Sequence, residues 1–292
     1  MLNGEVGFFP SFAMNTKLIL LLIGLLFFGT VNYTFPEVDK TKRGYEELFI
    51  KGATYYATGE YQKAIPLLVE ATQSGYGDER AWFFLGSCYS VVGNTEKAIK
   101  AYQNAIGIKP DFVEAYDQLV SAYREVGKDQ EAIEALEEMI RIRPDDAEAR
   151  NRLGISYAEI GLYNQAVETY KRAIRMNPNK SDFFYNLGSA YSELQLYRDA
   201  AEAYEQVIAM KPGEVSVYFD LGVVYCKSGR YTEGIEAFQK VINANPKDPA
   251  AHYALGIAYL LADNKMAALK QAEILKGLDK ERADKLLADI SD

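Results

Sequence analysis

The chain has 292 residues, of which 49% are apolar and 25% charged, a composition that indicates a folded protein and not a disordered one. Its net charge of -9 argues against nucleic acid as a partner, because neutralising phosphates requires concentrated lysine and arginine. Histidine occurs once, as His252, and the two cysteines are far apart, so zinc sites and Ser-His-Asp or Cys-His catalytic sets lack their parts. We therefore predict a non-enzymatic protein without catalytic residues, metal or cofactor.

The first feature along the chain is an uncharged apolar run over residues 18–31, LILLLIGLLFFGTV, preceded by Lys17. A helix of this length spans about 21 Å, less than the roughly 30 Å hydrocarbon core of a membrane. That length fits the apolar part of a secretory signal peptide, whereas a helix continuing through Phe35 becomes long enough to span the membrane. We predict a signal peptide or N-terminal membrane anchor over residues 1–32, followed by a linker over residues 33–44.

Export follows from either reading of this segment. The protein is expected to be anchored to the membrane by this hydrophobic helix or, if the segment is cleaved, to be periplasmic or extracellular. Membrane contact is expected only through residues 18–35. Met14 provides a more typical signal start than Met1, and the sequence leaves open the start codon, the cleavage and the topology.

A regular repeat follows the linker. Prolines recur at a constant interval, at positions 110, 144, 178, 212 and 246. Counted from Tyr45, seven blocks of this period fit without an insertion: 45–78, 79–112, 113–146, 147–180, 181–214, 215–248 and 249–282. Within a block, position eleven is tyrosine in all seven copies, position eight is glycine in all but one, and position twenty is alanine in all but one.

Each block has the pattern of two amphipathic helices. The first helix carries the residues at positions eight and eleven, and the second carries a small residue and an aromatic four residues later, as in Ala98 and Tyr102. Small residues allow two helix axes to approach closely, and the proline near the block end stops the second helix. Because one hairpin cannot bury its apolar face alone, neighbouring blocks must stack into a solenoid.

The two ends of the repeated region depart from the pattern. The first block has Tyr76 in place of the proline and Pro66 within its second helix. After the last block, residues 279–292 are predicted to form a capping helix. The cysteines Cys88 and Cys226 lie in first helices four blocks apart, too far for a disulfide, whose Cα atoms must lie within about 7 Å, so we predict two free thiols.

The seven copies resemble the tetratricopeptide repeat family, over residues 45 to about 282. The resemblance implies an all-α, right-handed superhelical solenoid of seven 34-residue helix–turn–helix repeats, with the capping helix and the N-terminal hydrophobic helix added. In this family the first helices line a concave groove that binds a partner polypeptide. On that basis positions five and six give the predicted partner-binding residues: Phe49, Phe83, Asp117, Asn151, Arg152, Tyr185, Asn186, Phe219, Asp220 and Tyr253.

Two functions remain open at this stage. The first is a scaffold, exported or tethered to the membrane, that binds a protein or peptide. The alternative is a substrate-recruiting subunit or relative of a protein O-glycosyltransferase that lacks the catalytic domain. Against the alternative, the asparagine series that such proteins carry at position six is represented only by Asn186. The aromatic rings at position five are equally expected to pack on neighbouring first helices, and the oligomeric state is open.

Overall fold

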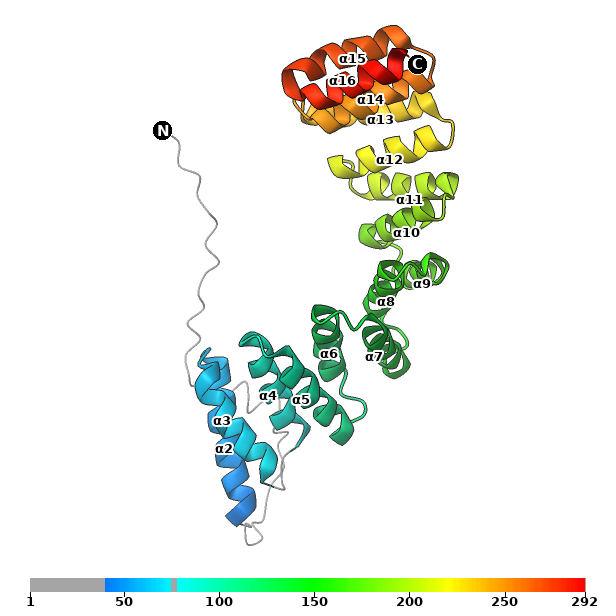
Figure 1. Cartoon of the computed structure of the whole chain (residues 1–292). Coiled ribbons are helices and arrows are strands. Elements are labelled where there is room, and N and C mark those ends of the chain that lie inside the picture. The colour runs from blue at the N-terminus through cyan, green and yellow to red at the C-terminus, as the bar shows by residue number, and fades with distance from the viewer. Residues whose placement is uncertain (1–39, 75–77, 292) are drawn as a thin grey trace. The chain divides into compact units, whose positions relative to one another are not determined.

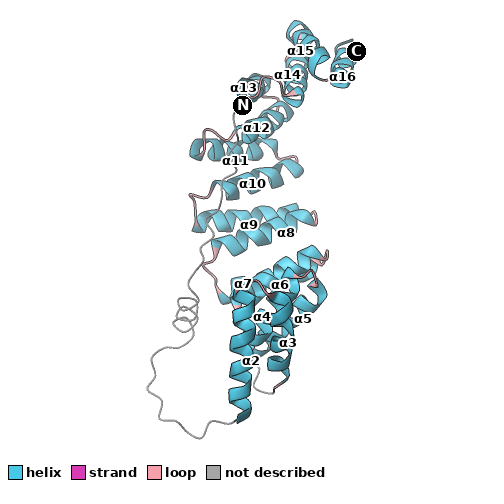
Figure 2. Cartoon of the chain, turned by 90° about the vertical axis from the view of Figure 1, so that its left-hand side faces the viewer, coloured by secondary structure: helices cyan, strands magenta, loops and turns pink. Residues whose placement is uncertain are grey.

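The computed structural model describes residues 40–74 and 78–291, and all regular structure in these ranges is helical (Figure 2). The predicted signal or anchor segment and most of the predicted linker lie outside the described residues. Fifteen helices follow one another in the described ranges (Figure 1): α2 (Lys40–Ala57), α3 (Tyr61–Gln73), α4 (Glu79–Val91), α5 (Thr95–Ile108), α6 (Val113–Glu125), α7 (Asp129–Ile142), α8 (Ala147–Glu159), α9 (Tyr163–Met176), α10 (Ser181–Glu193), α11 (Tyr197–Met210), α12 (Val215–Lys227), α13 (Tyr231–Ala244), α14 (Pro249–Leu261), α15 (Lys265–Leu278) and α16 (Lys280–Ser291).

The helices that follow the predicted linker pack in consecutive pairs. Helix α4 packs on α5, α6 on α7, and so on to α14 on α15, while the second helix of each pair also packs on the first helix of the next. The last helix, α16, packs on both α14 and α15. The described part of the chain is therefore an all-helical solenoid of stacked helix pairs, as the sequence predicts.

Short polar side chains cap some of the helix starts. Asp78, Asp146 and Asp248 accept hydrogen bonds from backbone amides in the first turns of α4, α8 and α14. These amides have no partner within the helix, so an aspartate at this place stabilises it by about 1 kcal/mol. Asn94 and Asn264 do the same for the second helices α5 and α15.

The inside of a helix pair is built on one repeated contact, between position eight of the first helix and position twenty-four of the second. A Cβ on Gly154 would lie 2.5 Å from the ring of Tyr170, and one on Gly222 would lie 2.7 Å from the ring of Phe238. Only glycine fits beneath such a ring. In the α6–α7 pair the ring is replaced by Leu136, and position eight is then a valine, Val120. Leucine at position twenty-four does not by itself make room for a larger residue, since a Cβ on Gly52 in the first block would lie 2.8 Å from the Leu68 side chain.

The turn between the two helices of a pair requires a left-handed residue. Five of these turns place glycine there, with φ between 69° and 83°: Gly59, Gly93, Gly127, Gly161 and Gly229. The same place is taken by Gln195, with φ of 59°, and by Asp263, with φ of 58°. A residue with a Cβ adopts this conformation at a cost of about 1–2 kcal/mol, so these two turns are strained by comparison with the other five.

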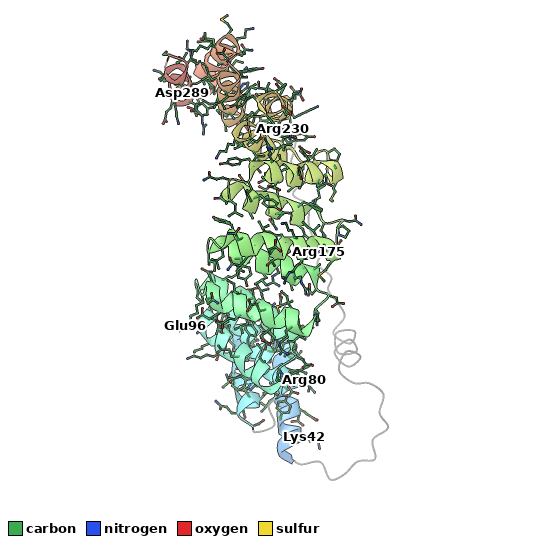
Figure 3. The ribbon with its side chains drawn as sticks, turned by 90° about the vertical axis from the view of Figure 1, so that its right-hand side faces the viewer. Lys42, Arg80, Glu96, Arg175, Arg230 and Asp289 are labelled. Atoms are coloured by element: carbon green, nitrogen blue, oxygen red, sulfur yellow. The ribbon has the colours of Figure 1, made fainter. Side chains whose placement is uncertain are left out.

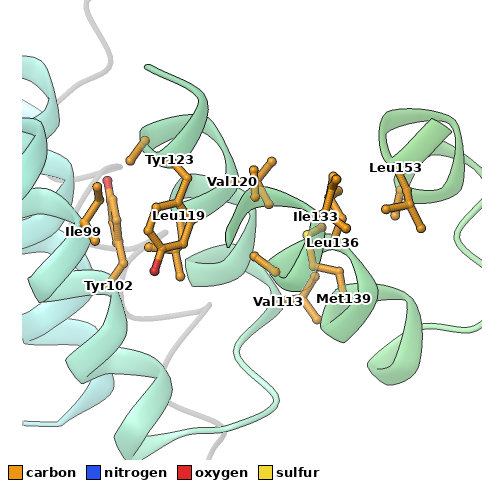
Figure 4. Close-up of a cluster of buried hydrophobic side chains, with 14 of the residues drawn as sticks. Ile99, Tyr102, Val113, Leu119, Val120, Tyr123, Ile133, Leu136, Met139 and Leu153 are labelled. Atoms are coloured by element: carbon orange, nitrogen blue, oxygen red, sulfur yellow. The ribbon is translucent and has the colours of Figure 1, made fainter. Parts of the chain in front are cut away.

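The invariant tyrosine at position eleven connects successive pairs. The Tyr157 hydroxyl donates to a carboxylate oxygen of Glu137 at 2.8 Å, and the Tyr225 hydroxyl donates to Glu205 at 2.6 Å. In both cases the acceptor lies on the second helix of the preceding pair. In the cluster around α5, α6 and α7, the ring of Tyr123 packs with leucine and valine side chains (Figure 4). Tyrosine at this position therefore contributes both apolar packing and a polar contact between pairs.

Both thiols are free, as predicted. Cys88 is fully buried in α4, and burial raises the pKa of its thiol to about 11. Cys226 is partly buried in α12, and its pKa is likewise raised to about 11. Position twenty is alanine in the other copies, but in the α12–α13 pair it is Gly234, whose added Cβ would lie 2.5 Å from the Cys226 sulfur. The sulfur therefore takes the space that an alanine methyl fills elsewhere.

The final pair departs from this scheme. Its position twenty-four is Ala272, which leaves no ring to cover Gly256. The space next to Gly256 is filled by the side chain of Leu286, from α16. Leu286 is fully buried, together with Leu275 and Ala283. The last helix therefore completes the interior of the α14–α15 pair.

Candidate partner-binding groove

The predicted partner-binding residues lie on the first helices α2, α4, α6, α8, α10, α12 and α14, and the structure brings most of them together in pairs. Position five of one first helix meets position six of the first helix in the next block. The Asp117 carboxylate forms an ion pair with Arg152. The Asn186 side-chain amide donates to the Asn151 side-chain oxygen at 3.0 Å. We call this series of contacts the five–six ladder.

At its N-terminal end the ladder is aromatic. The ring of Phe49 stacks on that of Tyr45, with centroids 6.0 Å apart, and lies 5.9 Å from the ring of Phe84. The guanidinium of Arg80, at the start of α4 (Figure 3), lies 5.1 Å from the Phe49 centroid. With only 8% of its surface exposed, Phe49 is chiefly a packing residue.

Phe83 is the next aromatic, and it lies at the edge of a cavity of about 380 Å³. Its ring centroid is 5.1 Å from that of Phe112 and 5.9 Å from that of Tyr102. Two other predicted residues, Asp117 and Arg152, line the same cavity. Three of the ten predicted residues therefore surround one opening between successive helix pairs.

Sequence reasoning missed part of this cavity. Its apolar wall includes Val113 and Met139, and its rim includes Arg143. Met139 and Arg143 come from α7 and the residue that follows it, whereas only first-helix positions were considered as groove residues. Two of the rim carboxylates are paired with cations, because Arg143 donates to Glu114 at 3.0 Å and Arg152 pairs with Asp117. Asp146 and Glu148 also line the cavity, which thus offers an apolar wall under a charged rim with an excess of carboxylates.

The middle of the ladder is polar and largely bonded to itself. Asn151 is only 5% exposed, and its side-chain oxygen is engaged by Asn186. A buried amide without partners is costly, so this contact stabilises the junction between α8 and α10. The one asparagine that matches the glycosyltransferase series, Asn186, is therefore used inside the ladder.

The next junction combines an aromatic ring with a carboxylate. The Tyr185 hydroxyl donates to the Asp220 carboxylate at 3.0 Å, and its ring lies 5.6 Å from that of Tyr204. Burial raises the pKa of Asp220 above its usual range. The neighbouring ring of Phe219 packs on Phe238 with centroids 5.5 Å apart. Tyr185 also borders a second cavity, of about 210 Å³.

At the C-terminal end the ladder meets the last helix. The Tyr253 hydroxyl donates to Asp289 of α16 at 3.3 Å, and the ammonium of Lys285 lies 5.4 Å from the Tyr253 centroid. The repeat period gives no sign of this contact, because α16 lies outside the repeated blocks. Tyr253 is therefore partly covered by the chain itself.

Two other kinds of feature do not occur in the described part of the chain. Nowhere in residues 40–74 and 78–291 do three or more histidine, cysteine, aspartate or glutamate side chains gather in a way that suits a metal ion. Within the same ranges, no helix has both the length and the apolar character needed to cross a membrane. The apolar run over residues 18–31 lies outside them.

Family models place the chain in a known class. Models described as tetratricopeptide repeat match residues 79–112, 185–249 and 219–277, and one described as TPR repeat matches residues 121–161 and 156–195. The chain belongs to the tetratricopeptide repeat family. No curated protein matches it at a significant level.

Solved structures show the same fold. The crystal structure of MamA is similar with a TM-score of 0.55 and 27% identity, over 59% of this chain and 94% of MamA. The C-terminal part of a TPR repeat-containing protein from Cytophaga hutchinsonii has a TM-score of 0.68 and 17% identity, over 81% of this chain and 98% of its own. YrrB, described as a TPR protein with an unusual peptide-binding site, has a TM-score of 0.56 and 20% identity, over 63% of this chain and 96% of its own.

Proposed function

We propose that this protein is a non-enzymatic scaffold that holds a partner polypeptide along the surface of its first helices. The observation that carries the proposal is the opening of about 380 Å³ beside Phe83, which combines an apolar wall with hydrogen-bonding groups at its rim. Pockets of this kind accept an anchoring side chain of a peptide, and aromatic residues dominate the energetics of such interfaces. Membership of the tetratricopeptide repeat family supports the same function.

Binding would use a surface that is formed before the partner arrives. The ion pair between Asp117 and Arg152 and the amide contact between Asn151 and Asn186 fix these side chains across neighbouring helix pairs. Side chains held in place lose little rotamer entropy on binding, and this favours affinity. An apolar side chain of the partner would enter beside Phe83 and Met139, while the amide of Gln118 remains within reach of the partner backbone.

The remaining features of the proposal rest on the sequence. The repeat period supports seven repeats over residues 45–282. The resemblance to the tetratricopeptide repeat family implies a right-handed superhelix whose first helices line a concave groove. The apolar run over residues 18–31 supports export, with a membrane tether or a cleaved signal. No feature of the described residues favours a role in protein glycosylation, and we do not propose one.

Selection of random twelve-residue peptides on phage by the full-length protein in detergent tests the scaffold function. Enriched peptides are expected, and replacing Phe83 with alanine should weaken the best of them at least tenfold, measured by fluorescence anisotropy. Val126→Ala is the matched control, since Val126 is 39% exposed and lies in the turn after α6. Thermal melting of both variants monitors folding.

Two outcomes contradict the scaffold function. Failure to enrich any peptide is the first. The second is equal affinity of the Phe83→Ala variant and the original protein for every selected peptide. The milder Phe83→Leu variant keeps the test valid if the alanine variant melts early, because leucine retains most of the apolar volume packed against Phe112.

A further inference from the structure

The five–six ladder contains two carboxylates, and their surroundings differ. Asp117 forms an ion pair with Arg152, so its charge is neutralised within the chain. Asp220 accepts a hydrogen bond from the Tyr185 hydroxyl at 3.0 Å, and among the described residues it has no lysine or arginine within ion-pair distance. One carboxylate of the ladder is thus supplied with a cation and the other is not.

Cations also accompany the aromatic residues at the two ends of the ladder. Arg80 lies over the ring of Phe49, at 5.1 Å from the centroid, and Lys285 lies over the ring of Tyr253, at 5.4 Å. Within the described ranges no cation lies over the ring of Tyr185, whose hydroxyl donates to Asp220. The α10–α12 junction therefore has the acceptors for a cation but no cation of its own.

The Asp220 carboxylate sits close to two tyrosines in a partly buried place. Burial, followed by the negative charge of Asp220, raises the pKa of both the Tyr185 and the Tyr204 hydroxyls. Lys211, a described cation bordering the same cavity as Tyr185, is already engaged by Asp182 at 3.2 Å. The junction therefore holds negative charge that is neither solvated fully nor paired.

We propose that Tyr185 and Asp220 form a subsite for a lysine or arginine side chain of the bound polypeptide. The inference rests on the scaffold function proposed above. A partner cation there would form an ion pair with Asp220 and would lie against the ring of Tyr185, whose face attracts a positive charge. Because the site is partly desolvated, these interactions are stronger than at an open surface. The subsite gives the groove a preference for basic segments, in keeping with the chain's net charge of -9.

The phage selection described above also tests the subsite when it is repeated with an Asp220→Asn variant. Asparagine retains an acceptor for the Tyr185 hydroxyl but removes the charge. Peptides selected by the original protein are expected to contain lysine or arginine at one position at least threefold more often than the unselected library. That preference should disappear with Asp220→Asn and persist with Glu202→Gln, which removes the same charge from an exposed position on α11.

A double-mutant cycle then connects the peptide cation to Asp220. With a fluorescein-labelled selected peptide, replacing its basic residue with alanine should weaken binding to the original protein about tenfold and binding to the Asp220→Asn variant less than twofold. A tenfold loss in both proteins overturns the subsite, as does enrichment of peptides without basic residues. Both of these results leave the scaffold function intact, whereas failure to enrich any peptide contradicts the scaffold function itself.

Discussion

The interior of the helix pairs and the five–six ladder use the repeated sequence in opposite ways. Inside the pairs, glycine at position eight faces a ring at position twenty-four in four copies: Gly86 with Tyr102, Gly154 with Tyr170, Gly188 with Tyr204 and Gly222 with Phe238. Along the ladder, four of the junctions carry in turn a ring pair, an ion pair, an amide pair and a tyrosine–carboxylate pair. The interior contacts are nearly the same in these four helix pairs, whereas the ladder side chains differ in chemistry from one junction to the next.

This difference has an energetic cause. A contact between a ring and a glycine leaves no room for another atom, so a change at either residue disturbs the packing of the whole pair. The ladder side chains are mostly part-exposed and touch one another at their ends, so solvent replaces a contact that is lost. Substitutions should therefore be costly inside the pairs and mild for stability along the ladder.

The largest effect is expected for Gly154→Ala. The added Cβ would lie 2.5 Å from the Tyr170 ring, and relieving that overlap should lower the free energy of unfolding by about 2–3 kcal/mol, measured by urea denaturation. Adding Tyr170→Leu should restore part of the loss, because Val120 already packs beside Leu136 in the α6–α7 pair. A loss no larger than that of an ordinary surface substitution, or a double variant less stable than either single one, contradicts the close-packed interior.

An intermediate effect is expected from alkaline pH. Burial raises the pKa of Cys88 from 9.0 to about 11 and that of Tyr102 from 10.0 to about 12. These groups ionise at lower pH in the unfolded chain, so the stability they contribute is fully present below pH 9 and is lost as pH rises through 11. The loss should be of the order of 1 kcal/mol per group.

Urea midpoints between pH 8 and pH 11 measure this effect. Cys88→Ala should reduce the dependence of the urea midpoint on pH. Alanine is tolerated at this position, because the equivalent residues of two other blocks are Ala122 and Ala190. If the urea midpoint depends on pH equally in the variant and in the original protein, Cys88 is accessible to solvent in the folded protein. Cys226, whose pKa is also raised to about 11, and buried tyrosines such as Tyr102 account for the pH dependence that remains in the variant.

The smallest effect is expected in the ladder, for Arg152→Ala. The side chains of Arg152 and Asp117 are 26% and 40% exposed, and ion pairs of this kind contribute less than about 1 kcal/mol. The urea midpoint should therefore shift only slightly, and the difference from the original protein should decrease further at high salt. A loss comparable to that of Gly154→Ala would mean that the ladder, and not only the interior, holds the pairs together.

The sequence predicts the interior well because the relevant neighbours lie within one block. The two amphipathic helices of each block and the small residues that let them approach follow from positions that recur from block to block. The free thiols follow from the four blocks that separate Cys88 from Cys226. The ladder is harder to predict because its contacts join different blocks, as Asp117 joins Arg152, and the period does not say which side chains meet there. Positions five and six were identified through a family resemblance, whereas their mutual pairing emerges from the structure.

Other features escape the sequence for local reasons. Gln195 occupies a left-handed turn position that glycine fills elsewhere, and neither its own type nor its neighbours indicate this. Met139 and Arg143 join the cavity beside Phe83 from a second helix, because the cavity lies between pairs. Tyr253 is engaged by α16, which belongs to no block.

The contact between Leu286 and Gly256 limits how the protein can be lengthened in evolution or by design. Duplicating a middle block is compatible with its neighbours, since each carries its own large side chain against its own position eight. Appending an eighth block after residue 282 would displace α16 and leave an empty space between Gly256 and Ala272. Adding a repeat at this end would therefore require a bulky residue at position 272, so the end of the repeated region is determined by residues inside the α14–α15 pair as well as by α16.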